Sequence, residues 1–118
     1  MLTIENLKEY GANVDEGIER CMNNEEIYLH LINMVLQDHS FEDLGEALNQ
    51  KIYDDAFEYA HKLKGVLANL ALTPIAEPVA ELTELLRNQT DGDYDSLYTR
   101  VMEEYEKLKA LSDDLVPA

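Results

Sequence analysis

The helical pattern of this protein is clearest in residues 52–71, which read IYDDAFEYAHKLKGVLANLA. At about 100° per residue, the apolar side chains of this segment fall on one stripe of a helix: Ile52, Ala56, Tyr59, Ala60, Leu63, Leu67 and Leu70. Such a stripe predicts a helix that buries one face in a core and leaves the opposite face to solvent. Because His61 falls roughly opposite the stripe, we expect its imidazole to be exposed.

Two residues one turn after His61 are its neighbours on the predicted helix surface. Lys64 and Gly65 stand at the i+3 and i+4 positions. A solvent-facing glycine inside a helix costs roughly 1 kcal/mol relative to alanine, which indicates that another molecule must approach the backbone there. A glycine that served helix packing would instead lie on the buried stripe. Lys64 can attract an anionic group on His61 by about 1 to 4 kcal/mol before salt screening. This setting suits an imidazole that carries a phosphoryl group and passes it to a docking partner.

The same outward face has small and apolar residues where charged ones are usual. Phe57 precedes His61 by one turn and Asp54 by two turns, and Ala68 follows it by two turns. This composition predicts a shallow, partly apolar docking patch around His61. The alternative is that Phe57 only widens the buried stripe of the helix.

The N-terminal half of the chain also reads as helices joined by short loops. Two short helices are expected within residues 3–11 and 13–22, and a longer one begins after the N-cap Asn24. Its core-spaced residues are Ile27, Leu31, Met34 and Val35, with Leu29, Ile32 and Leu36 widening the apolar face. This width predicts a helix buried on most sides. Ser40 and Asp43 resemble a capping box that restarts or bends the helix, which continues to about residue 49.

Two more helices are expected in the C-terminal half. Thr73 and Pro74 supply an N-cap and an N1 proline for the helix that follows, so the His61 helix ends near Leu72. Pro78 lacks the N–H that an interior turn needs, and the new helix therefore either kinks there or begins only there. After a turn at residues 89–93, the last helix has an apolar stripe beside a stripe of tyrosines: Leu97, Val101, Leu108, Leu111, Tyr94, Tyr98 and Tyr105.

The composition and these patterns predict an all-α protein. The chain has 118 residues with 5 Gly and 3 Pro, and no run alternates at period two for long. We expect an antiparallel four-helix bundle with one or two short N-terminal helices, in a single domain over residues 1–118. A monomer is expected, although the tyrosine stripe suits burial in the core or in a dimer.

Charge and cysteine content restrict the partners and the location. A formal net charge of −16 argues against nucleic acid and against an anionic membrane surface, since both attract clustered Lys and Arg. Cys21 is the only cysteine, so an intramolecular disulfide is impossible. The first residues lack the basic and apolar regions of a signal peptide, and no stretch is apolar enough to span a membrane. These features predict a cytoplasmic location.

Residues 60–70, AHKLKGVLANL, resemble the phosphorylation helix of histidine-containing phosphotransfer (HPt) domains. The motif there is His, any residue, Leu, Lys, Gly, followed by small residues and an Asn-Leu-Gly-like ending. The resemblance implies that His61 is phosphorylated, that Lys64 supports the phosphoryl group and that Gly65 leaves room for it. Ala71 departs from the motif, because the family usually has glycine there, and a different helix end is therefore expected.

The resemblance further implies a phosphocarrier in a two-component phosphorelay. Such a carrier accepts a phosphoryl group from an aspartyl phosphate of one receiver domain and passes it to another response regulator. The implied partners are receiver domains and, in some cases, a hybrid sensor histidine kinase. The receiver supplies the aspartate and a Mg²⁺ ion, so we expect this chain to bind no cofactor or metal and not to be an enzyme. The alternative function is a non-phosphorylated helical adaptor that binds a receiver domain or a sensor kinase.

Overall fold

The computed structural model describes residues 1–88 and 92–112, which form seven helices and no strand. The helices are α1 (Ile4–Tyr10), α2 (Val14–Arg20), α3 (Glu25–Leu36), α4 (Ser40–Asn49), α5 (Tyr53–Asn69), α6 (Thr73–Arg87) and α7 (Tyr94–Ser112). The predicted all-α class is confirmed. Of the predicted turn at 89–93, residues 89–91 lie outside the described part of the chain.

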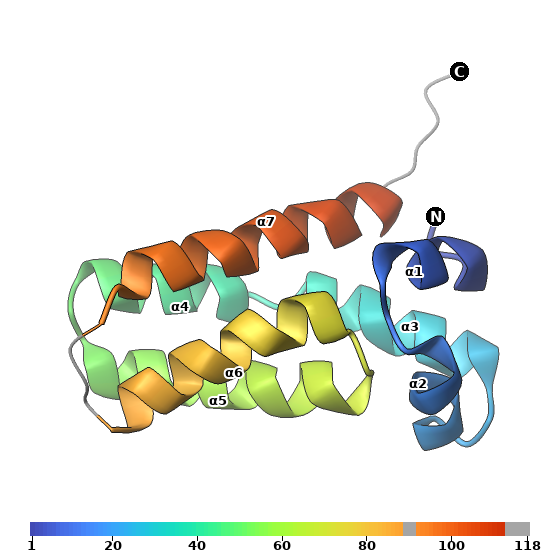
Figure 1. The fold of residues 1–118 in the computed structure, drawn as a ribbon, viewed down its shortest axis with the longest axis horizontal. Helices are drawn as coiled ribbons and strands as arrows, with labels where there is room; N and C mark the ends of the chain where they lie inside the picture. The colour runs from blue at the N-terminus through green and yellow to red at the C-terminus, as the bar shows by residue number, and fades with distance from the viewer. Residues whose placement is uncertain (89–91, 113–118) are drawn as a thin grey trace.

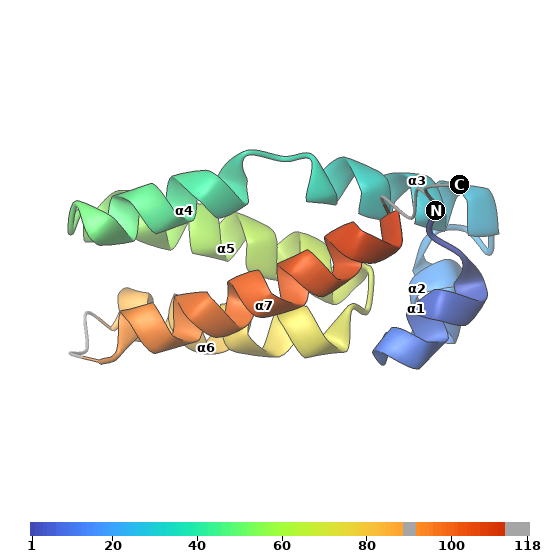
Figure 2. The ribbon, with the colours of Figure 1, turned by 90° about the horizontal axis from the view of Figure 1, so that it is seen from above.

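Four antiparallel rods make up the bundle, and the first of them is broken into α3 and α4 (Figure 1). Seen from above, α3 and α4 follow one another along one side, while α6 and α7 lie opposite (Figure 2). The helix α5 packs against both α4 and α6, and α6 packs against α7. The short helices α1 and α2 cover the end of the bundle where α3 begins and α5 turns into α6 (Figure 1). Among the described residues, each helix is too short or too polar to cross a lipid bilayer.

The core lies between these rods and contains both aliphatic and aromatic side chains. Its largest fully buried members are Tyr28, Phe41, Leu7, Ile32, Leu44, Leu63, Leu67, Leu70, Leu72, Ile75, Leu82 and Leu108. Each such side chain contributes about 1.5 to 3 kcal/mol by leaving water. The half-buried tyrosines of α7 also belong to this chain's own packing. Tyr98 donates its hydroxyl proton to the carbonyl oxygen of Phe41 at 3.0 Å, and Tyr105 donates to that of Leu36 at 2.8 Å.

The buried face of α3 is not the predicted one. Tyr28 and Ile32 are completely buried, whereas Met34 is 54% exposed and Ile27 is 37% exposed. The helix has two apolar stripes, but it is the outer part of a broken rod, and only one stripe can face the core. The expectation that this helix is buried on most sides is therefore wrong. The second stripe, which includes Leu31, is left partly open to solvent.

The break between α3 and α4 is confirmed, but its cap differs from the prediction. Ser40 is the first residue of α4, and its backbone N–H donates to Asp38 Oδ1 at 2.8 Å. The Ser40 hydroxyl accepts a hydrogen bond from Lys62 instead of capping the helix. The predicted capping box with Asp43 is therefore wrong, because the carboxylate of Asp38 takes over the role of cap.

The ends of α5 each differ from the sequence pattern by a few residues. Ile52 precedes the helix and is 43% exposed, so it does not belong to the buried stripe. The helix ends at Asn69, and Ala71 follows with φ of 55° in the left-handed region. That conformation is the one for which glycine is usual at a helix end. The backbone N–H of Leu72 then bonds the carbonyl oxygen of Leu67 at 3.1 Å, as in a Schellman motif.

The helix α6 runs without interruption past its internal proline. Thr73 is its first residue and Pro74 stands within its first turn, so Thr73 is not the N-cap that was predicted. The alternative that regular structure begins only at Pro78 is wrong, since α6 starts at Thr73. Pro78 is buried against the rest of the bundle.

Candidate functional site

His61 lies near the middle of α5, on the face that points away from the core. Ala56, Ala60, Leu63 and Leu67 are buried at helical spacing on the opposite side, which holds the helix in one rotation. His61 itself is exposed. The ring of Phe57, one turn earlier, stacks on the imidazole with 5.5 Å between ring centroids and 16° between ring planes. This contact gives an exposed histidine a defined orientation.

Phe57 joins His61 to the neighbouring helix α6. It is partly buried against the core, and the guanidinium carbon of Arg87 stands 5.2 Å from the centre of its ring. Asp54, an exposed residue, lines a small pocket together with Phe57 and Arg87. Phe57 thus both widens the packed face of α5 and forms the surface beside His61, which the sequence had presented as alternatives.

The two residues after His61 that were singled out from the sequence are accessible. Lys64 is half buried, and within the described residues its ammonium group makes no hydrogen bond or ion pair. Gly65 is exposed, and a Cβ built there would have no heavy atom of another described segment within 4 Å. Close packing against the described residues therefore does not explain the glycine.

Lys62, the residue directly after His61, is engaged elsewhere. Its Nζ lies 3.0 Å from Asp38 Oδ2 and donates a hydrogen bond to Ser40 Oγ at 3.1 Å. Burial alone would raise the pKa of Asp38, but hydrogen bonds from Ser40 and Lys62, together with the Lys62 charge, hold that pKa below its ordinary range. Of the two lysines near His61, Lys64 is thus the one whose charge is available to an incoming anion.

A groove of about 730 Å³ runs along α5 beside His61. One wall comes from α3 and the residue Asp38 beyond it, and the other comes from α5. The lining residues are Leu31, Met34, Val35, Asp38, His61, Lys62, Gly65, Val66, Asn69 and Leu70. The open apolar stripe of α3 is thus one side of this groove. The sequence patterns did not predict the groove. The signal in the sequence was the second apolar stripe of α3, because a helix at the edge of a bundle buries only one stripe.

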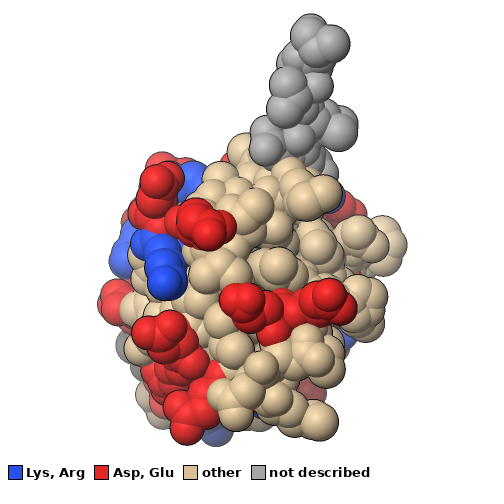
Figure 3. Space-filling model, turned by 90° about the vertical axis from the view of Figure 1, so that its right-hand side faces the viewer, with Lys and Arg blue, Asp and Glu red and all other residues tan. Residues whose placement is uncertain are grey.

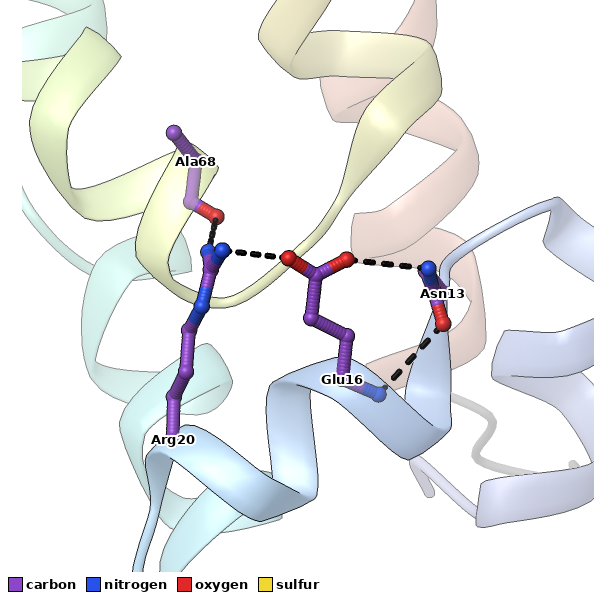
Figure 4. Close-up of polar contacts among 4 residues, drawn as sticks. All are labelled: Asn13, Glu16, Arg20 and Ala68. Carbon is purple, nitrogen blue, oxygen red and sulfur yellow. Dashed lines mark hydrogen bonds and ion pairs between the residues drawn. The ribbon is translucent and has the colours of Figure 1, made fainter.

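The carboxyl end of α5 is held by the N-terminal segment. Arg20 donates from Nη1 to the carbonyl oxygen of Ala68 at 2.7 Å and pairs through Nη2 with Glu16, whose other oxygen accepts from Asn13 (Figure 4). A cation at this end also suits the negative pole of the helix dipole. Ala68, the third predicted docking residue, is exposed, and its carbonyl oxygen is the one that Arg20 binds.

Two further hydrogen bonds, one from α3 and one from the residue before α2, reach the turn after α5. The Tyr28 hydroxyl donates to the carbonyl oxygen of Leu70 at 2.9 Å. The backbone N–H of Asn13 donates to the carbonyl oxygen of Ala71, also at 2.9 Å. Burial raises the pKa of Tyr28 to about 12, with Cys21 contributing. At this end of the molecule the exterior is largely uncharged, with acidic side chains across its middle and both acidic and basic side chains along its left edge (Figure 3).

Comparison with known proteins places this fold and site in a family. Residues 32–112, more than half of the chain, match the family model of the Hpt domain. The chain therefore belongs to the Hpt domain family, whose members are phosphocarrier modules of two-component signalling and interact with receiver domains and kinases. Comparisons with curated proteins and with solved structures gave no significant match. The matched range contains His61 and every groove-lining residue except Leu31, whereas α1 and α2 lie outside it.

Proposed function

We propose that this protein is a phosphorelay carrier that accepts a phosphoryl group on His61 from an aspartyl phosphate of a receiver domain. It then passes the group to a second response regulator. The observation that supports this most is the surroundings of His61: an exposed imidazole oriented by Phe57, with an unengaged lysine and an open glycine one turn away.

In the proposed step, the lone pair of an imidazole nitrogen attacks phosphorus. The P–O bond to the donor aspartate breaks, its carboxylate leaves, and the new N–P bond forms while the ring loses a proton to water. Phosphoryl transfer passes through a loose transition state that depends on positioning and on neutralised charge. Lys64 supplies part of the positive charge, and the receiver domain brings the remaining part as Mg²⁺. Transfer onward is the reverse of this step on another receiver.

The receiver is proposed to cover His61 and to contact this chain on both sides of that histidine. Asp54 and Phe57 would meet it on the α6 side, the groove on the α3 side, and Ala68 at the far end beside Arg20. Because Gly65 has no side chain, the backbone of the receiver can come close to the imidazole. We propose that the carrier works as a monomer in the cytoplasm and that a hybrid sensor histidine kinase starts the relay.

The test is transfer of labelled phosphate from a phosphorylated receiver to the purified protein. Wild type should gain an acid-labile, base-stable label, and His61→Gln should gain none. His30→Gln, at another exposed histidine, should still be labelled. Labelling of His61→Gln would refute the assignment of the acceptor. A wild-type protein that binds the receiver yet gains no label would be the adaptor.

A further inference from the structure

The groove beside His61 is closed at each end by a polar contact between its two walls. Near His61, Lys62 of α5 contacts Asp38 and Ser40 just beyond α3. At the other end, Tyr28 of α3 contacts the carbonyl oxygen of Leu70. Between these contacts the facing side chains are mostly apolar, as Met34 and Val66 illustrate. These two polar contacts therefore tie the α3 wall to the α5 wall at either end of the groove.

The contact near His61 joins three parts of the chain through one carboxylate. Asp38 lies in the break between α3 and α4, accepts the Ser40 N–H at 2.8 Å through Oδ1, and faces Lys62 through Oδ2 at 3.0 Å. The same carboxylate therefore caps α4 and ties the break to the residue next to His61. Without Lys62, the carboxyl end of α3 would lose this connection to α5.

The contact also matters for the charge of the groove. Asp38 and Lys62 are lining residues with opposite formal charges, and they neutralise each other at its rim. A partner that covers the groove with an apolar surface removes water from both groups. Burying a charge is tolerable when it is paired and costly when it is not. The pair therefore lets an apolar surface dock directly beside the phosphoryl-accepting imidazole.

We propose that Lys62 is a positioning residue for phosphotransfer, which acts through Asp38 to hold the α3 wall where an apolar surface of the receiver docks. This inference rests on the proposed function. Lys62 does not contact the phosphoryl group in this role, and Lys64 remains the lysine that does. The receiver is the occupant of the groove, because His61 itself lines the groove and a partner that reaches the imidazole therefore covers it.

The experiment compares two phosphoryl donors that differ in their need to dock. Phosphoramidate is small: its P–N bond breaks, ammonia leaves, and the N–P bond to His61 forms without any use of the groove. A phosphorylated receiver must dock. In Lys62→Ala, labelling by phosphoramidate should proceed at the wild-type rate. The KM for the receiver should rise by about fivefold, as expected for the loss of one partly exposed ion pair, with a smaller change in kcat.

Three further variants test whether Lys62 acts through Asp38. Lys62→Arg should restore the KM, because a guanidinium can still pair with the carboxylate. Asp38→Asn should raise the KM as well, and the double variant should be no worse than Lys62→Ala alone. Lys107→Ala, which removes a lysine paired with Glu104 at 3.0 Å on α7, is the matched control and should leave both donors unaffected.

Several outcomes would overturn the proposal. An equal loss with both donors would mean that Lys62 acts on the phosphoryl group itself, and an unchanged KM would mean that the groove does not need it. Additive effects of Lys62→Ala and Asp38→Asn would mean that Lys62 contacts the receiver directly. If neither donor labels His61 of the wild-type protein, the proposed function is wrong, and the role proposed for Lys62 is then wrong as well.

Discussion

The replacement of Gly65 by alanine should make the protein more stable and a poorer carrier. Gly65 lies inside α5 on its exposed face, and an added Cβ would meet no heavy atom of another described segment within 4 Å. A methyl group at this position therefore causes no clash within the chain. The cost of glycine in a helix is removed, while the space beside His61 becomes smaller.

The size of both effects can be estimated. An alanine in place of glycine in an exposed helix interior contributes about 1 kcal/mol. For a domain of 118 residues, this corresponds to a rise in Tm of about 4 °C. A docked receiver displaced by roughly 1 Å loses on the order of 10- to 100-fold in transfer rate. Labelling of His61 by phosphoramidate should change much less, because a small donor does not approach the helix backbone as a receiver does.

The assay combines urea unfolding with the two phosphoryl donors on the same preparation. Gly17→Ala is the matched control with the opposite sign, because its Cβ would overlap the Tyr28 ring and lie 2.7 Å from the carbonyl oxygen of Leu70. That variant should lose about 1 to 3 kcal/mol of stability. A destabilised Gly65→Ala protein, or a stabilised one with an unchanged rate of receiver-driven transfer, would refute the reasoning.

Three other substitutions each test the role of one side chain. Lys64→Ala should slow receiver-driven transfer by about 5- to 10-fold without lowering the Tm, since its ammonium group makes no described contact; a lowered Tm would show a structural role instead. Tyr28→Phe should cost about 1 to 2 kcal/mol in urea unfolding, because the buried carbonyl of Leu70 loses its donor, and an unchanged midpoint would contradict this. Asp38 has a lowered pKa in the folded state, so its stabilising effect is present above about pH 4 and is lost as the pH falls further. The free energy of unfolding of wild type should therefore exceed that of Asp38→Asn by less at pH 3 than at pH 7. A difference in the urea midpoint that stays constant with pH would count against the pairing with Lys62.

The exposed site on α5 could be predicted from the sequence because it depends on one helix. Once residues 53–69 are helical, the period of 3.6 residues places Leu63 and Leu67 on one side and His61 on the other. The exposure of Gly65 follows from the same period. No contact with another part of the chain enters this reasoning, and the structure accordingly has these side chains where the pattern predicted them.

The sequence did not determine which of the two apolar stripes of α3 enters the core, because both have helical spacing. That choice depends on the position of α3 at the end of a broken rod, where Tyr28 reaches Leu70 across 42 positions in the chain. Likewise, Lys62 and Ser40 are 22 positions apart, and nothing in their local patterns pairs them. Periodicity records only which side of a helix is apolar. The tertiary structure decides what that side faces, and here it turned an apparent core stripe into the wall of a groove beside His61.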